Sequence, residues 1–192
     1  MNESRIGIRR VGQPGDLGWM VMAHGEVYAA EYGWDASFEA LVARIVADFA
    51  AGAGRPGQAG WIAELDGRRV GCVLCVPADP AGADPAGADV TAGAAGRTAQ
   101  LRILLVDPAA RGSGIGGRLV DECVGFARRA GYRELRLWTN DPLLAARHIY
   151  LSRGFSLVEE EPHRSYGADL VGQVYELDLL SSPTSPQRAD LI

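Results

Sequence analysis

The sequence contains no lysine, and all 19 of its basic residues are arginine. This absence excludes any mechanism that needs a catalytic or phosphate-binding lysine. A Walker A loop, which ends in Gly-Lys-Ser/Thr, is one of the excluded phosphate sites. Together with abundant alanine and glycine, the exclusive use of arginine indicates a GC-rich bacterial genome, which reflects coding bias rather than function.

An excess of positive charge is also missing. The 24 acidic residues give the chain a net charge of −5 at pH 7, whereas a nucleic-acid-binding protein normally presents a basic face. The sequence has no apolar run long enough to span a membrane and no signal-peptide start. We therefore expect a cytoplasmic protein that has neither a nucleic acid nor a membrane as its partner.

Cysteine is scarce, with three residues in the chain. Cys72 and Cys75 form a C-x-x-C pair inside an apolar, strand-like run, where their side chains would point to opposite faces of a sheet. No second cysteine pair and no His-x-x-x-His follows, so we expect no metal site. We interpret Cys72, Cys75 and Cys123 as small buried hydrophobic residues.

The length and composition fit a single globular domain with a sizeable core, since 47% of the 192 residues are hydrophobic and 22% are charged. We place this domain at residues 1–180. Residues 77–97 form a low-complexity insert with two copies of Pro-Ala-Gly-Ala-Asp, which predicts a loop between two strands. Residues 181–192 are rich in serine and proline and predict a disordered tail.

Hydrophobic periodicity predicts the element order β-α-α-β-β-β-α-β-α-β-β. Asp16 follows a turn and is predicted to cap the first helix. The strands are expected at residues 5–11, 61–65, 70–76, 101–106, 134–139 and 174–179, with a further strand that begins at 155–158. The helices are expected at 17–32, at 35–49, from a glycine-rich stretch to about 130, and at 143–153. This order predicts an α/β (α+β) fold with a mixed, mostly antiparallel, twisted sheet of six to seven strands, flanked by about four helices.

One glycine-rich stretch, Arg111-Gly-Ser-Gly-Ile-Gly-Gly-Arg118, follows an apolar strand and leads into a helix. Glycines at a strand-to-helix turn let the backbone approach a ligand closely. The amides at the N-terminus of the helix would face that ligand, and they favour anions such as phosphates. The stretch therefore predicts a phosphate-bearing ligand that is held mainly by backbone groups.

A dinucleotide site is one candidate for this ligand, because Gly112, Gly114 and Gly117 match the fingerprint Gly-x-Gly-x-x-Gly. In that fingerprint the first glycine follows directly after the strand, whereas here residues 107–111 intervene. The motif also lies late in the chain and not in an opening βαβ unit. We keep the dinucleotide site as the weaker alternative.

A resemblance on two motifs points to a different ligand. Val106-Asp-Pro-Ala-Ala-Arg111-Gly-Ser-Gly114-Ile-Gly116 resembles the acetyl-CoA signature Arg/Gln-x-x-Gly-x-Gly/Ala of the GNAT superfamily of N-acetyltransferases. Downstream, Ala146-x-x-x-Tyr150-x-x-x-Gly154-Phe155 resembles the second motif of that superfamily, at a compatible distance. The resemblance covers about residues 5–179 and implies a GNAT fold, with which the predicted element order agrees.

Four shorter segments resemble the acetyltransferase half of bacterial proteins that fuse a MarR-type regulator to a GNAT domain. They are His24-Gly-Glu-Val-Tyr28, Glu31-Tyr-Gly-Trp-Asp35, Leu137-Trp-Thr-Asn-Asp141 and Glu161-Pro-His-Arg-Ser165. We expect the regulator half to be absent, because this chain starts at the first acetyltransferase strand. The resemblance therefore does not imply DNA binding.

The GNAT resemblance implies acetyl-CoA (CoA) as the cofactor. Its pyrophosphate would lie on the amides of the glycine-rich stretch, and its pantetheine arm along the backbone of the preceding strand, where an amide would also polarise the thioester carbonyl. The implied cofactor-binding residues are Leu104, Leu105, Val106, Arg111, Gly112, Ser113, Gly114, Ile115, Gly116, Gly117, Asn140, Ala146 and Tyr150. Asn140 is among them because Leu143 occupies the position, seven residues before the tyrosine, where the superfamily often has asparagine.

For the transfer itself, the resemblance assigns Tyr150 as the general acid that protonates the leaving thiolate. No motif identifies the general base. His24 and Glu31 interrupt the apolar stripe of the first helix and are the base candidates, and a water relay is an alternative. The candidate substrate residues are Tyr28 and Glu31, Asp35 at the helix junction, and His163 in the expected loop between the last two strands.

The resemblance thus implies an enzyme, an acyl-CoA-dependent N-acetyltransferase. It would move the acetyl group of acetyl-CoA to a primary amine of a small molecule or peptide, by direct attack in a ternary complex. A CoA-binding sensor or interaction module of the same fold, without catalysis, is the alternative. The sequence does not identify the acceptor amine. Family members are often dimers, which makes a homodimer one candidate assembly.

Overall fold

The computed structural model of the chain describes residues 5–78 and 98–181. The loop expected at residues 77–97 and the tail expected at 181–192 lie almost wholly outside the described residues. No helix in the described ranges is long and apolar enough to cross a membrane. Within the same ranges, no group of three or more His, Cys, Asp or Glu residues could hold a metal ion.

The described strands form one mixed sheet in the order β1-β2-β3-β4-β5-β7-β6. Neighbouring strands are antiparallel except β4 and β5, which are parallel. The strands are β1 (Ile6–Arg10), β2 (Ala59–Leu65), β3 (Arg68–Pro77), β4 (Thr98–Val106), β5 (Glu134–Asn140), β6 (Ser156–Ser165) and β7 (Ala168–Asp178). The helices are α1 (Asp16–Tyr32), α2 (Ala36–Ala51), α3 (Ile115–Arg129) and α4 (Leu144–Leu151), with a short 3₁₀ helix at Pro108–Ala110. The predicted fold class is confirmed.

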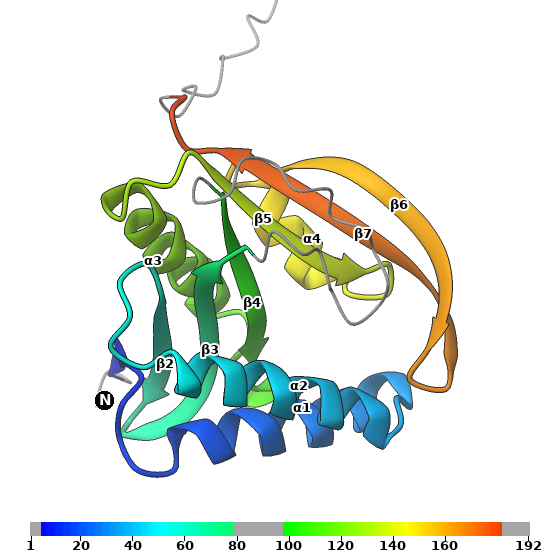
Figure 1. Ribbon diagram of the computed structural model, residues 1–192. Helices are drawn as coiled ribbons and strands as arrows, with labels where there is room; N and C mark the ends of the chain where they lie inside the picture. Colours follow the sequence, from blue (N-terminus) through cyan, green and yellow to red (C-terminus); the bar gives the residue numbers. More distant parts are fainter. Residues whose placement is uncertain (1–4, 79–97, 182–192) are drawn as a thin grey trace, which may run out of the picture.

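The helices cover both faces of this sheet, with α1 and α2 on one side and α3 and α4 on the other (Figure 1). The alternation along β3 reflects this arrangement. Cys72 packs in the cluster that contains Met20 of α1 and Val42 of α2, whereas Cys75 packs in the cluster that contains Leu119 of α3. The two cysteines therefore point to opposite faces and are buried, as predicted.

The last two strands of the sheet are longer than predicted. The strand expected to begin at residues 155–158 starts at Ser156 and runs to Ser165, and the last strand begins at Ala168 rather than at 174. His163 therefore lies within β6 and not in a loop, which corrects the prediction. The reason is that β6 is an edge strand, and residues 156–162 are all exposed. Such a strand needs no alternation of apolar and polar residues, so hydrophobic periodicity does not predict its full length.

The sheet opens between β4 and β5. The parallel ladder joins residues 98–101 of β4 to residues 134–137 of β5 and extends no further. Directly after this ladder, Ile103 has a φ of 47°, which is a strained conformation for a β-branched residue. The pairing of β4 with β3 also shifts register at this point. The bulge turns the second half of β4 away from β5 and leaves room between the two strands.

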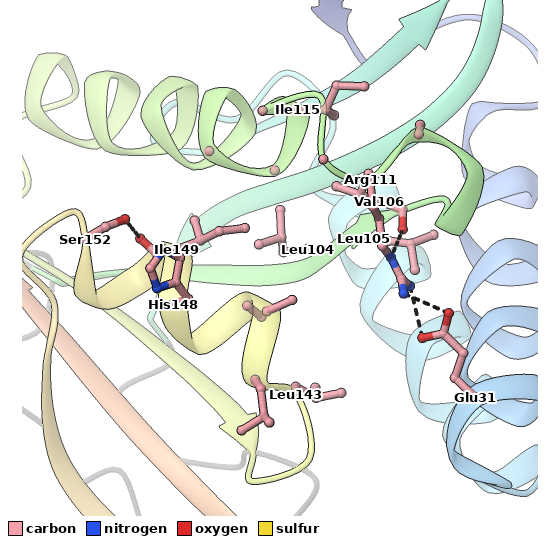
Figure 2. A pocket seen from close by; sticks show the side chains of 18 of the residues that line it. Glu31, Leu104, Leu105, Val106, Arg111, Ile115, Leu143, His148, Ile149 and Ser152 are labelled. Atoms are coloured by element: carbon pink, nitrogen blue, oxygen red, sulfur yellow. Dashed lines mark hydrogen bonds and ion pairs between the residues drawn. The ribbon is translucent and has the colours of Figure 1, made fainter.

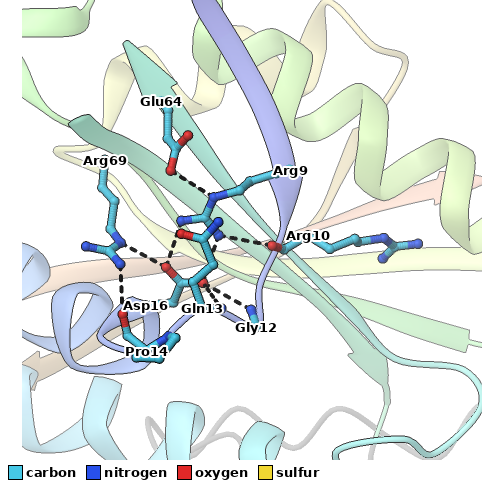
Figure 3. A network of polar contacts seen from close by, with 8 residues as sticks. All are labelled: Arg9, Arg10, Gly12, Gln13, Pro14, Asp16, Glu64 and Arg69. Carbon is cyan, nitrogen blue, oxygen red and sulfur yellow. Dashed lines mark hydrogen bonds and ion pairs between the residues drawn. The ribbon is translucent and has the colours of Figure 1, made fainter. Parts of the chain in front are cut away.

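Asp16 does not cap α1, which corrects a second prediction. Gly15 occupies the N-cap position in a left-handed conformation, and the side chain of Asp16 is fully buried. The carboxylate of Asp16 accepts two hydrogen bonds from Arg9, of 2.8 and 2.9 Å, and one of 2.8 Å from Arg69 (Figure 3). The amides of Gly12 and Gln13 donate to it as well. This network ties β1 and β3 to the start of α1.

The ion pairs of this network make the stability of the protein depend on pH. The hydrogen bonds from Arg9 are the main cause that holds the pKa of Asp16 well below its usual value. The unfolded chain therefore binds a proton at higher pH than the folded chain does. As a result, the stabilisation is fully present above about pH 4 and is lost as the pH falls toward the lowered pKa.

We expect Asp16→Asn to lower the free energy of unfolding at pH 7 by about 1.5–3 kcal/mol. The substitution removes the buried carboxylate that pairs with two half-buried guanidinium groups, so that Arg69 loses this counter-charge and Arg9 keeps only Glu64. Urea denaturation at pH 7 and pH 3 measures this, and the deficit of the variant should shrink at pH 3. The control is Asp121→Asn, which breaks a pair with Arg153 whose carboxylate is 59% exposed, and which should cost no more than about 1 kcal/mol. Equal stabilities of Asp16→Asn and the wild type at pH 7 would contradict this account.

Candidate functional site

A pocket of about 870 Å³ lies where the end of β4 meets α1, α3 and α4 (Figure 2). We call it the outer pocket. Its lining residues are Tyr28, Glu31, Tyr32, Leu104, Leu105, Val106, Ala110, Arg111, Gly112, Gly114, Ile115, Gly116, Gly117, Leu143, Leu144, Ala145, Ala146, His148, Ile149, Ser152 and Arg153. Of the predicted cofactor-binding residues, all but Ser113, Asn140 and Tyr150 line this pocket.

The glycine-rich stretch forms one wall of the pocket. Gly112 and Gly114 both have a φ of 78°, a conformation that favours glycine. A Cβ atom at either position would meet no heavy atom within 4 Å, so the space beside them is open. The first hydrogen bond between α3 and its N-cap residue runs from the amide of Arg118 to the carbonyl of Gly114. The amides before Arg118 therefore precede the helical ladder, and together with the helix dipole they favour an anion.

The absence of side chains at two further glycines lets α3 lie close to α4. A Cβ at Gly116 would come within 2.7 Å of Ile149 Cδ1, and one at Gly117 would collide with the guanidinium of Arg153. Arg153 also donates two hydrogen bonds, of 2.7 and 3.1 Å, to the carboxylate of Asp121 on α3. Sequence reasoning missed Arg153, because nothing in the sequence signals its pairing with a residue 32 positions away.

Arg111 closes the side of the outer pocket that faces α1. Its guanidinium makes an ion pair of 2.8 Å with Glu31 and donates a second hydrogen bond of 3.0 Å to the same carboxylate. Its Nε also donates to the carbonyl of Val106 at 3.2 Å (Figure 2). The pair links the end of β4 to the last turn of α1. Glu31, one of the two base candidates, is thus engaged with a cation at the pocket wall.

The end of β4 forms the floor between these walls. Leu104, Leu105 and Val106 all line the outer pocket, and in Figure 2 the β4 ribbon runs between α3 and the Arg111–Glu31 pair. The position of this segment depends on β3, because a Cβ at Gly71 would lie 2.9 Å from the carbonyl oxygen of Leu105. The glycine allows the two strands to pair closely at the site.

A second, smaller space adjoins the outer pocket on the side of the gap between β4 and β5. We call it the inner cavity; it has a volume of about 80 Å³. Tyr28, Leu104, Leu143 and Ala146 line both spaces, so these four residues form a shared wall. The other lining residues of the inner cavity are His24, Trp34, Phe38, Leu41, Val42, Ile45, Leu101, Arg102, Ile103, Trp138, Thr139, Asn140 and Tyr150.

Tyr150 lies in this inner cavity and is 4% exposed. Its ring packs against Phe155 and Tyr175 at centroid distances of 5.7 and 6.2 Å. Burial is the main cause that raises the pKa of its hydroxyl, with smaller contributions from Tyr28 and Cys123. The hydroxyl therefore keeps its proton at neutral pH. The structure records no hydrogen bond to it from the described residues.

His24, the other base candidate, is buried beside the same cavity, with 1% of its surface exposed. Its Nδ1 lies 2.7 Å from the carbonyl oxygen of Met20, whereas its Nε2 has no hydrogen-bond partner among the described residues. Burial lowers the pKa of the imidazole to about 4, and the hydrogen bond to Met20 opposes this shift. His24 is therefore neutral at physiological pH.

The remaining candidate residues are only partly brought to the site. Asp35 caps α2 by accepting a hydrogen bond of 2.9 Å from the amide of Ser37, and it lines neither space. His163 also lines neither, although its Nε2 makes a hydrogen bond of 2.9 Å with Asn140 Oδ1. Asn140 itself lies in the inner cavity rather than the outer pocket. The hydroxyl of Ser113 donates to the carbonyl of Ala110.

Comparison with known proteins supports one family. A family model described as the acetyltransferase (GNAT) family matches residues 21–155, which is more than half of the chain and includes both predicted motifs. A comparison with curated protein sequences gave no match.

Solved structures with the same fold include three bacterial proteins. An N-acetyltransferase from Staphylococcus aureus Mu50 has a TM-score of 0.69 at 20% identity, over 92% of this chain and 99% of that one. A ribosomal-protein-alanine N-acetyltransferase from Brucella melitensis has a TM-score of 0.67 at 19% identity, over 90% and 99%. A GNAT family acetyltransferase from Elizabethkingia anophelis, solved with acetyl-CoA bound, has a TM-score of 0.56 at 14% identity, over 93% and 99%. At these identities the likeness shows a shared fold.

We expect Gly71→Ala to lower the free energy of unfolding by about 1–3 kcal/mol, because the new methyl group would press on the carbonyl of Leu105. The matched control is Gly7→Ala in β1, where a Cβ would meet nothing within 4 Å and the change should stay within about 0.5 kcal/mol. Urea denaturation of both variants tests this. Equal effects of the two substitutions would refute the close approach of β3 and β4 at the site.

Proposed function

Because the chain belongs to the acetyltransferase (GNAT) family, we propose that it transfers the acetyl group of acetyl-CoA to a primary amine, by direct attack in a ternary complex. The observation that carries this proposal is the shared wall of Tyr28, Leu104, Leu143 and Ala146. On one side of it lies a large pocket with an anion-binding helix terminus. On the other lies a small, buried cavity that contains a protonated phenol and a neutral imidazole.

The outer pocket fits acetyl-CoA in size and in chemistry. Its volume of about 870 Å³ lies at the upper end of the range for small-molecule and cofactor sites. The amides of residues 112–117 would hold the pyrophosphate, with the guanidinium of Arg153, two residues after α4, close to Gly117. The backbone of Leu104, Leu105 and Val106 would hold the pantetheine arm. Membership of the GNAT family and the acetyl-CoA bound to the Elizabethkingia neighbour favour this ligand over a dinucleotide.

When bound, acetyl-CoA supplies an acetyl group on a thioester, which an amine can attack. The task of the protein is to hold the amine uncharged, to polarise the carbonyl with a backbone amide of β4, and to donate a proton to the departing sulfur. Tyr150 donates this proton. Its hydroxyl is protonated because burial raises its pKa. No described residue competes for the proton, and the shared wall is next to Tyr150.

The finer likeness to the acetyltransferase half of MarR-type fusion proteins remains a prediction, and we propose no DNA binding for this chain. We retain the expectation of a cytoplasmic location and of a homodimer as one candidate assembly. The acceptor is a primary amine on a small molecule or a peptide.

We expect Tyr150→Phe to lower kcat for acetyl transfer about 100-fold or more, because it removes the proton donor, while the Kd for acetyl-CoA stays the same. Release of the CoA thiol with a panel of primary amines measures the rate, and calorimetry measures the affinity. Tyr175→Phe is the matched control. It alters a buried tyrosine whose hydroxyl donates to Gln173 Oε1 and which lines neither space, and it should leave kcat unchanged.

Two outcomes would contradict the proposal. If Tyr150→Phe retains the wild-type kcat, Tyr150 is not the acid. If the wild-type protein binds acetyl-CoA tightly but releases no thiol with any amine of the panel, the protein is a CoA-binding module without catalysis.

A further inference from the structure

We propose that His24 is the acceptor site of this protein: its Nε2 accepts a hydrogen bond, and during the reaction the proton, from an uncharged amine attached to a compact apolar group. The inference rests on the proposed acetyl transfer and adds to it the residue that receives the amine and the chemical class of the acceptor. It is carried by His24 Nε2, the one fully buried side-chain polar atom without a hydrogen-bond partner among the described residues that line the inner cavity.

The hydrogen bonds of His24 determine which ring nitrogen carries the proton. A carbonyl oxygen can only accept, so the 2.7 Å contact with the carbonyl of Met20 places the proton on Nδ1. Because the ring is neutral at physiological pH, Nε2 then presents a lone pair. A buried polar atom without a partner is unfavourable, because it has lost its hydrogen bonds to water. Nε2 is such an atom, and a donor that enters the inner cavity would satisfy it.

The ring of His24 is held in a fixed orientation. It stacks on Tyr28 with a centroid distance of 5.8 Å and an angle of 13° between the rings, and it also contacts Phe38 at 6.3 Å. Tyr28 belongs to the shared wall with the outer pocket. A donor bound at Nε2 would therefore lie on the inner side of the wall whose outer side faces the proposed acetyl-CoA site.

The charges around the inner cavity indicate an uncharged acceptor. None of the residues that line it is an aspartate or a glutamate, and its one permanently charged lining residue is Arg102. The guanidinium of Arg102 donates to Gln100 Oε1 at 3.0 Å. An ammonium group would be buried here without a carboxylate and in the field of a cation, which is strongly unfavourable. An amine that is neutral at pH 7 avoids both penalties.

The size and walls of the cavity define the rest of the acceptor. Trp34, Phe38 and Trp138 contribute aromatic surface. The volume of about 80 Å³ is smaller than a cavity of about 150 Å³ that holds benzene, so the walls must shift to admit a single ring, and a long chain is excluded. An arylamine combines a flat apolar group with a nitrogen that is uncharged at neutral pH. Polyamines, whose nitrogens are ammonium groups at this pH, do not match the site.

The atoms balance in the step that involves His24. The amine nitrogen forms a bond to the acetyl carbon, the bond between that carbon and sulfur breaks, and the sulfur takes a proton from Tyr150. The nitrogen loses one proton, which moves to His24 Nε2. An attacking nitrogen becomes strongly acidic, so a weak base is sufficient to accept its proton. After the products leave, exchange with solvent removes the extra proton from His24 and restores the lost proton of Tyr150.

The first test measures amine binding without acetyl-CoA. Aniline and cyclohexylamine have similar ring sizes, but the first is uncharged at pH 7.5 and the second is cationic. The ¹⁵N chemical shift of His24 Nε2 should change on titration with aniline and stay constant with cyclohexylamine. Aniline should also bind at least about tenfold more tightly, which corresponds to one satisfied hydrogen bond and an avoided buried charge. An Nε2 shift that stays constant at saturating aniline would overturn the proposal.

The second test uses two substitutions, each of which retains the hydrogen-bonding role of only one of the two ring nitrogens of His24. In His24→Asn, the short amide can still donate to the carbonyl of Met20 but leaves the position of Nε2 empty. In His24→Gln, the longer amide reaches the position of Nε2 and can accept a hydrogen bond there, but it cannot take a proton. We expect His24→Asn to raise both the Kd and the KM for aniline about tenfold. His24→Gln should keep KM near the wild-type value, and both variants should lower kcat about 100-fold.

Acetyl-CoA affinity serves as the internal control, since His24 itself does not line the outer pocket. Wild-type kcat and KM in a folded His24→Asn variant would overturn the proposal, and if that variant does not fold, the Nε2 titration of the wild type still decides. Failure of the two proposals can be distinguished. If aniline moves Nε2 but no amine is acetylated, acetyl transfer fails and the amine site stands. If cyclohexylamine or spermidine is acetylated and aniline leaves Nε2 unmoved, acetyl transfer stands and the amine site fails.

Discussion

The separation of β4 from β5 is the constraint on which both ligand spaces depend. The two strands pair in parallel over four residues each and then part, where Ile103 adopts a left-handed conformation. A continuous ladder would fill the gap with backbone hydrogen bonds and leave no room for the inner cavity. Because the sheet opens here, Leu104 can line the outer pocket and the inner cavity at once. The strained backbone at Ile103 therefore allows the proposed sites for acetyl-CoA and for the acceptor to lie next to each other.

The two spaces divide the chemistry between charge and desolvation. The outer pocket provides groups that interact with a charged ligand. These are the helix amides outside the hydrogen-bonded ladder and two arginines, Arg111 and Arg153, each of which is paired with a carboxylate. Around the inner cavity, burial shifts two pKa values in opposite directions and makes both groups neutral: it raises that of Tyr150 and lowers that of His24. A phenol that keeps its proton and an imidazole that lacks one of its two protons are the acid and base that amide formation requires. The same burial excludes the ammonium form of an amine.

The sequence predicted what local chemistry determines. The glycine-rich turn was recognisable because positive φ angles at Gly112 and Gly114 favour glycine, and the element order followed from apolar periodicity. Pairings between distant residues were not predictable, such as Arg111 with Glu31 across 80 positions or Asp16 with Arg69 across 53. The position of His163 within a strand was not predictable for a related reason. An exposed edge strand such as β6, which buries neither face, shows no alternation of apolar and polar residues. The left-handed conformation of Ile103 could not be predicted from the sequence, because isoleucine is an ordinary residue for a buried strand.

A crystal structure of the protein with a non-hydrolysable acetyl-CoA analogue tests the central claim most directly. The account predicts the pyrophosphate on the amides of residues 112–117 and the acetyl group at the shared wall of Tyr28, Leu104, Leu143 and Ala146, next to the hydroxyl of Tyr150. An acetyl group that points to solvent, with the inner cavity closed off from the thioester, would contradict it.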